Sequence, residues 1–206
     1  MSLFTQLVSK TIMHVPGPIV GHFAKGYIAG SKLDHAVAVT RDLNRQGMLT
    51  TIDILGEFIT SMDQARFFKN QCLQILTAIH AEGLGSNLSL KPTQLGLSLD
   101  QAACYANLEE IVAQAARLGS FVRIDMEDHP CTDATLEFFR RLRTAYPGHV
   151  GTVLQSYLRR TPGDIEALAD GELNFRLCKG IYNEPRLHAY KDPAVVNRNY
   201  VFCLEK

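Results

Sequence analysis

Ser120-Phe121-Val122-Arg123-Ile124-Asp125-Met126 has the pattern of a short strand that ends in a charged residue. Three further runs also place a polar residue at their carboxyl ends, namely Leu88–Lys91, Val153–Gln155 and Phe175–Lys179. Alternate residues of a strand face the same side, so Arg123 and Asp125 share one face. Because a buried charge is costly unless it is paired or used, polar strand ends indicate an active site rather than an inert core. The pattern therefore points to an enzyme.

Strand patterns begin near residues 48, 87, 120, 150 and 173, and helical patterns separate them. Helices are expected over 61–80, 100–118 and 132–146, with another beginning near Thr161-Pro162. Repeated strand–helix units predict a parallel sheet. A doubly wound dinucleotide-binding sheet would have a Gly-rich turn after its first strand, whereas Gly56-Glu57-Phe58 stands there. We therefore expect an α/β fold, an incomplete (β/α)8 TIM-type barrel with about five βα units.

Residues 1–46 are expected to form an N-terminal helical segment, which Pro16-Gly17-Pro18 interrupts. Ser31 is a candidate N-cap for its last helix, and Gly47 lies just past the end of that helix. Residues 47–206 are expected to form the partial barrel, with a helix over 192–206, and the whole chain is expected to be a single domain. These ~160 residues are fewer than the ~250 of a complete barrel.

The 206-residue chain is balanced in charge, with 21 Lys plus Arg and 21 Asp plus Glu, so no basic excess suggests nucleic acid as a partner. The five cysteines are odd in number, well separated and without a CxxC pair, which predicts reduced thiols in a cytoplasmic protein. No signal-peptide pattern or run of ~20 apolar residues is present, so a membrane span is not expected. Composition leaves peripheral membrane contact open.

Several chemical roles are open for the residues at the strand ends. Lys91 suits an anionic substrate or a Schiff base, and a solvated loop lysine is the structural alternative. Asp125 suits a base, a metal ligand or the partner of a cation, and the alternative is an internal ion pair with Arg123 or Arg176. Because Glu127 and Asp128 are expected in a loop and the histidines lack ligand spacing, no metal site is expected.

The later strand ends have the polar groups that a cofactor requires. Gln155 carries an amide that needs partners when buried, which the edge of a heteroaromatic ring would supply. Arg176 could hold negative charge on a reduced cofactor, and Lys179-Gly180 forms a turn where a backbone can approach a phosphate closely.

Taken together, these segments resemble the proline dehydrogenase family, the flavin enzymes that oxidise L-proline, and in particular its monofunctional bacterial type. The four motifs that carry the resemblance occur in the family's order and spacing, and they are Ser89–Gly96, Arg123–Glu127, Val153–Leu158 and Arg176–Tyr182.

The resemblance implies FAD at the carboxyl ends of the strands of a distorted (β/α)8 barrel. It implies hydride transfer from proline C5 to flavin N5, which gives 1-pyrroline-5-carboxylate, and electron transfer to a quinone. Contact with the inner face of the membrane and a downstream pyrroline-5-carboxylate dehydrogenase would accompany this chemistry. By motif position, the implied site residues are Lys91 and Tyr182 for substrate, Asp125 and Arg176 as the catalytic pair, and Met126, Gln155, Lys179, Gly180 and Ile181 for the cofactor.

The chain departs from the family pattern at Cys178 and Ile181, where the family usually has Val and Ala, and Ile181 is expected to crowd the flavin loop. The family also continues through three more strands and a helix with paired arginines that clamp the substrate carboxylate. Since these have no counterpart before Lys206, we expect a C-terminally truncated chain that binds FAD weakly and turns over little. The alternatives are a barrel enzyme with a Schiff base at Lys91 or Lys179, and a non-catalytic fragment that associates with itself.

Overall fold

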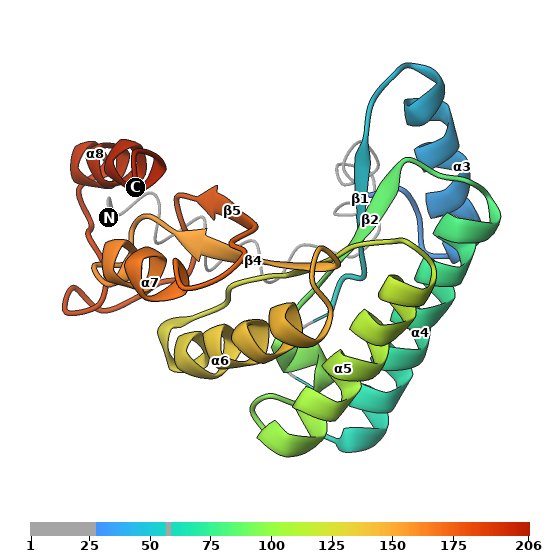
Figure 1. Ribbon diagram of the computed structural model, residues 1–206, viewed down its shortest axis with the longest axis horizontal. Coiled ribbons are helices and arrows are strands. Elements are labelled where there is room, and N and C mark those ends of the chain that lie inside the picture. Colours follow the sequence, from blue (N-terminus) through green and yellow to red (C-terminus); the bar gives the residue numbers. More distant parts are fainter. Residues whose placement is uncertain (1–27, 57–58) are drawn as a thin grey trace, which may run out of the picture.

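The computed structural model describes residues 28–56 and 59–206 (Figure 1). Five parallel strands pair in chain order, which are β1 (Thr50–Asp53), β2 (Ser86–Leu90), β3 (Val122–Ile124), β4 (Val150–Gln155) and β5 (Phe175–Cys178). Helices separate the strands, as the alternating sequence pattern predicts, and they are α4 (Met62–Ala81), α5 (Gln101–Arg117), α6 (His129–Ala145) and α7 (Thr161–Leu168). The predicted α/β fold with about five βα units is confirmed as a half-barrel.

The N-terminal helical segment is described only in part, because 1–27 and the predicted break at Pro16-Gly17-Pro18 lie outside the described residues. Within it, α3 (Leu33–Arg45) packs against β1 and α4. Its N-cap is Lys32, which makes no side-chain capping bond, so the prediction of Ser31 as the cap is wrong by one residue. Gly47 terminates α3 with a φ of +81°, a left-handed conformation that glycine adopts without strain. The boundary at residue 46 stays a prediction.

The starts of α4 and α5 follow local capping chemistry. Ser61 accepts a hydrogen bond from Gln64 N at the start of α4, and Asp100 accepts one from Ala103 N at the start of α5. A final helix, α8 (Pro193–Leu204), packs against α7 and β5. Ser and Asp N-caps can be recognised in the sequence, which is why these helix starts could be predicted.

The two faces of the sheet differ in chemistry. Leu88, Leu90, Val122 and Ile124 face the helices and are fully buried, and Figure 1 shows α4, α5 and α6 side by side along that face. The register pairs Ser89 with both Asp53 and Arg123, so polar residues of adjacent strands meet on the opposite, concave face. The apolar face therefore forms the core, and the polar face is left for function.

Within residues 28–56 and 59–206, none of the helices combines the length and apolar character that a membrane span requires. All five cysteines are free thiols, and Cys178 alone is half-buried, whereas Cys72, Cys104, Cys131 and Cys203 are buried.

Candidate active site

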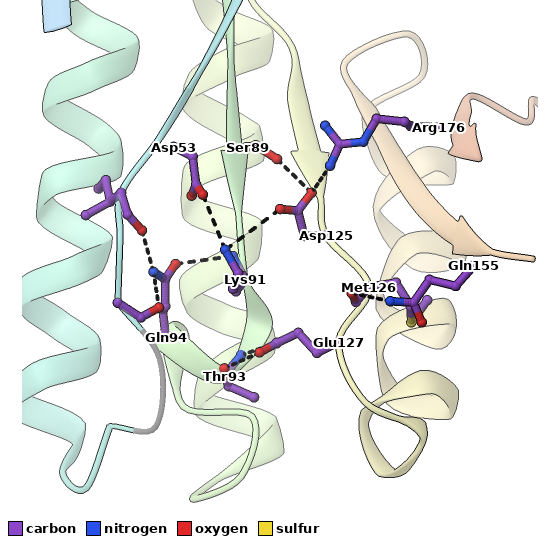
Figure 2. A network of polar contacts seen from close by, with 12 residues as sticks. Asp53, Ser89, Lys91, Thr93, Gln94, Asp125, Met126, Glu127, Gln155 and Arg176 are labelled. Atoms are coloured by element: carbon purple, nitrogen blue, oxygen red, sulfur yellow. Dashed lines mark hydrogen bonds and ion pairs between the residues drawn. The ribbon is translucent and has the colours of Figure 1, made fainter. Parts of the chain in front are cut away.

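A network of charged side chains lies at the carboxyl ends of the strands (Figure 2). Lys91 follows β2, Asp125 follows β3 and Arg176 belongs to β5, so three of the four sequence motifs converge on one site. Asp125 is the centre of the network. Its Oδ1 accepts hydrogen bonds from Arg176 Nη2 at 2.7 Å and Ser89 Oγ at 2.8 Å, and its Oδ2 lies 4.0 Å from Lys91 Nζ.

Of the two arginines that the sequence offers to Asp125, the structure pairs Arg176. Arg123 turns toward the neighbouring strands instead, where its Nη1 donates to Thr152 O at 3.0 Å and Asn174 O at 3.1 Å. Gly151 makes room for this guanidinium, because a Cβ there would lie 2.3 Å from Arg123 Nη1. Arg123 thus ties β3 to the entry of β5 and has a structural position, whereas Arg176 remains half-exposed beside Asp125.

Asp53, at the end of β1, is a member of the network that the sequence reasoning missed. Its Oδ2 lies 3.3 Å from Lys91 Nζ, so two carboxylates flank this ammonium. Burial raises the pKa of the Asp53 carboxyl, and the positive charge of Lys91 opposes that rise. The rule that identified Lys91 and Asp125 applies to Asp53 as well, because Asp53 is also a charged residue at the carboxyl end of a strand pattern.

The turn after β2 is fixed by two buried polar residues that were not expected to matter. Gln94 Nε2 donates to Ile54 O at 2.6 Å and Gly56 O at 2.5 Å, and its Oε1 accepts from Lys91 N at 3.2 Å. Gln94 therefore links the end of β1 to the backbone of Lys91. Thr93, next to it, is hydrogen-bonded through both its N–H and its hydroxyl to the buried Glu127 carboxylate. These contacts hold Lys91 in register with Asp53 and Asp125.

Gln155 and Met126 form a second polar position on the same face. Both residues are buried, and Gln155 Nε2 donates to Met126 O at 3.2 Å. Gln155 Oε1 is also buried and has no hydrogen-bond partner among the described residues. A buried amide oxygen without a partner is unfavourable in an inert core, so this atom is suited to accept an N–H from a bound ligand.

The turn after β5 carries the remaining predicted residues, Lys179–Tyr182. Gly180 has a φ of +101°, and a Cβ there would lie 2.2 Å from the Tyr157 ring, so only glycine fits. Ile181 is 89% exposed, and its side chain lies in solvent. Lys179 is exposed and Tyr182 is half-buried.

The described residues contain no cluster of three or more His, Cys, Asp and Glu side chains that could hold a metal ion. His129, the histidine nearest to Asp125 in the sequence, is instead in contact with Glu184, with 2.5 Å between Nδ1 and Oε2.

A parallel β/α sheet with polar groups at the carboxyl ends of its strands is the arrangement from which (β/α)8 barrels build their active sites. Residues 36–187 match the family model described as Proline dehydrogenase. The chain belongs to the proline dehydrogenase family, whose members are FAD-dependent oxidoreductases.

Curated relatives agree with this assignment. The chain is 38% identical over 183 residues to a proline dehydrogenase of Deinococcus radiodurans, and 38% identical over 179 residues to proline dehydrogenase 2 of Bacillus subtilis. Each alignment covers 87% of this chain and 59% of the relative. The chain thus spans about three fifths of the length of these relatives.

Solved structures resemble the chain in fold. Proline utilization A from Bdellovibrio bacteriovorus, inactivated by N-propargylglycine, superposes with a TM-score of 0.82 at 24% identity, over 89% of this chain and 24% of that one. A 3-keto-D-glucoside 4-epimerase from E. coli superposes with a TM-score of 0.51 at 16% identity, over 84% of this chain and 73% of that one. Since an epimerase shares the barrel, the fold alone does not define the chemistry.

Proposed function

We propose that this chain provides the flavin-binding and proline-binding strands of a proline dehydrogenase. When bound, FAD would supply the two-electron oxidation: a hydride would leave C5 of L-proline for the flavin N5 and the amine nitrogen would release a proton, which gives 1-pyrroline-5-carboxylate, and the electrons would then pass to a quinone. Because the chain spans about three fifths of its relatives, the reaction of the whole protein is a proposal for this chain. A membrane quinone pool and a downstream pyrroline-5-carboxylate dehydrogenase are the partners that this chemistry implies.

The observation that carries the proposal is the network of Lys91, Asp125 and Arg176 on the concave face. We assign Lys91 to the substrate carboxylate, because its side chain is 16% exposed and it is the more buried of the two cations in the network. Arg176 is 45% exposed and can turn its free guanidinium nitrogens toward negative charge on a reduced cofactor, while Asp125 holds its orientation. Tyr182 is assigned to the border of the substrate pocket.

The residues assigned to the cofactor have the properties that a flavin requires. Gln155 Oε1 is a buried acceptor in need of an N–H, which the edge of an isoalloxazine ring provides. Gly180 packs its backbone against the Tyr157 ring, which fixes the turn of Lys179, Gly180 and Ile181 directly after β5, and we assign this turn to the cofactor. The Ile181 side chain is in solvent, and the crowding of the flavin loop that its bulk leads us to expect stays a prediction.

A Schiff-base mechanism at Lys91 is the less favourable alternative. The Lys91 amine is already engaged by two carboxylates, at 3.3 Å from Asp53 and 4.0 Å from Asp125, whereas carbonyl attack needs an amine that is free to approach its substrate. Borohydride treatment with a carbonyl substrate distinguishes the two, because the proposal predicts no covalent adduct at Lys91 or Lys179.

The proposal is tested by loading the 206-residue chain with FAD and measuring reduction of bound flavin by L-proline in the absence of oxygen, with dye reduction as the steady-state assay. We expect weak flavin binding and slow, proline-dependent bleaching that Lys91→Ala abolishes, because the substrate carboxylate then lacks its cation. Lys69→Ala, which removes a lysine paired with Glu110 on the helical face, is the matched control. Bleaching that is equal in both variants would contradict the assignment. Rapid turnover would overturn the expectation that a further arginine clamp is required.

A further inference from the structure

The loop between β5 and α8 is exposed over most of its length, yet it contains a buried carboxylate. Within 181–192, Glu184 and Ala189 are the buried residues, and Glu184 is only 3% exposed. Burial of a carboxylate is costly unless it is paired and hydrogen-bonded. Its position in a loop that also carries Gly180, Ile181 and Tyr182 calls for an explanation.

Both oxygens of Glu184 contact the first residue of α6. Oε1 accepts a hydrogen bond from His129 N at 2.7 Å, and Oε2 lies 2.5 Å from His129 Nδ1. The N–H groups of a first helical turn lack partners within the helix, and the helix dipole favours an anion there. Asp128, the N-cap residue, makes no side-chain capping bond. Glu184 therefore caps α6 from a distant part of the sequence.

The same loop is held to the segment that follows β4. Tyr157 N donates to Lys179 O at 2.9 Å before the turn, and an antiparallel bridge joins Leu158 to Ala189 after it. The ring of His188 stacks on that of His129 with 3.9 Å between centroids, which strengthens the same attachment. Glu184 lies between these two anchors, at the centre of the loop.

We propose that Glu184 is a positioning residue that fixes the turn of Gly180, Ile181 and Tyr182 against the carboxyl ends of the strands, so that the turn is preorganised for the cofactor. This inference rests on the proposed flavin function of that turn. The physical reason is entropic, because a loop that is ordered before binding does not have to be ordered by the ligand.

The experiment compares Glu184→Ala and Glu184→Gln in the full 206-residue chain. Hydrogen exchange of peptides from 179–190, without FAD, reports the order of the loop, and titration of FAD fluorescence reports affinity. We expect Glu184→Ala to speed exchange in this loop and to weaken FAD binding by about tenfold, as for a lost charge-assisted hydrogen bond. Glu184→Gln keeps an oxygen for His129 N, so it should restore most of the order and affinity.

Asp164→Asn is the matched control, because Asp164 is a largely buried carboxylate paired with Arg160 at the start of α7. It should lower the melting temperature without faster exchange in 179–190. If hydrogen exchange in 179–190 were unchanged in Glu184→Ala, Glu184 would not hold the loop in place, whether or not FAD binds. Faster exchange with FAD affinity equal to that of Asp164→Asn would overturn the positioning role. If the wild-type chain binds no FAD, the proposed function fails. The exchange experiment still shows whether Glu184 orders the loop.

Discussion

The two faces of the parallel sheet follow opposite rules. On the helix side, Leu88, Leu90 and Ile124 are buried in contact with other apolar groups, as a protein interior requires. On the concave side, residues one position away carry polar or charged groups that face one another, as Asp125 does with Arg176. Because successive residues of a strand alternate between faces, one short motif supplies both apolar residues for the core and polar residues for the concave face. The difference indicates that the first face determines stability and the second determines chemistry, which mutations can test.

The largest loss of stability is expected on the apolar face. Leu90→Ala removes a side chain that is 1% exposed, so the free energy of unfolding should fall by about 3 kcal/mol. Leu49→Ala truncates a leucine that is 86% exposed and should change it by less than about 0.5 kcal/mol. Urea unfolding followed by circular dichroism measures both. Similar losses in the two variants would mean that Leu90 does not belong to the core.

On the polar face, Asp125→Ala should cost less stability and more function. It leaves Ser89, Lys91 and Arg176 without their shared acceptor, and we expect a loss of about 1–2 kcal/mol because the pairs are partly solvated. Asp133→Ala, which removes a carboxylate that is 85% exposed, should have almost no effect in the same unfolding assay. A loss for Asp125→Ala as large as that for Leu90→Ala would place Asp125 in the core rather than the site.

The reactivity of the cysteine thiols distinguishes the two faces of the sheet in the folded protein, without a mutation that alters stability. Burial raises the pKa of the Cys72 thiol to about 12 and also raises that of Cys104, which suppresses their thiolates, whereas Cys178 is half-buried on β5 beside Gln155. A thiol reagent at pH 8 should therefore modify Cys178 first and the others only on unfolding. Cys178→Ser should remove the fast phase, and FAD should slow it. A fast phase that survives this substitution would contradict the arrangement.

The smallest expected effect concerns Asp53. Since burial raises its pKa in the folded state, the folded protein holds the proton more tightly, and the free energy of unfolding falls as pH rises through that pKa. Asp53→Asn removes the cost of ionising this buried carboxyl. The variant should therefore be slightly more stable than the wild type at pH 7, and the gain in stability should vanish toward pH 4. Asp42→Asn, at an exposed position, should show no such trend. A gain that is independent of pH would contradict the burial of Asp53.

Much of the fold could be predicted from local sequence, and less of the site. The order of strands and helices follows from apolar periodicity, and the starts of α4 and α5 follow from Ser61 and Asp100. The start of α6 was expected at Thr132 but lies at His129, because Glu184 caps the helix from 55 residues away. No local pattern reports a contact of that range.

The charged residues show the same limit. The strand pattern alone left several roles open for Asp125 and offered Arg123 and Arg176 alike for an ion pair, whereas the family resemblance implied Arg176. The choice depends on Gly151, which admits the Arg123 guanidinium from the neighbouring strand. Cross-strand neighbours follow from register, and register is fixed only by the folded sheet.

The most direct test of the account is a titration of FAD fluorescence with the wild-type chain and two arginine variants. Arg176→Ala alters the concave face, and Arg117→Ala alters an exposed residue at the end of α5. We expect saturable binding that Arg176→Ala weakens by about tenfold, as for the loss of a charge-assisted contact, and that Arg117→Ala leaves unchanged. Absence of saturable binding, or equal affinity in both variants, would contradict the assignment of the concave face to the flavin.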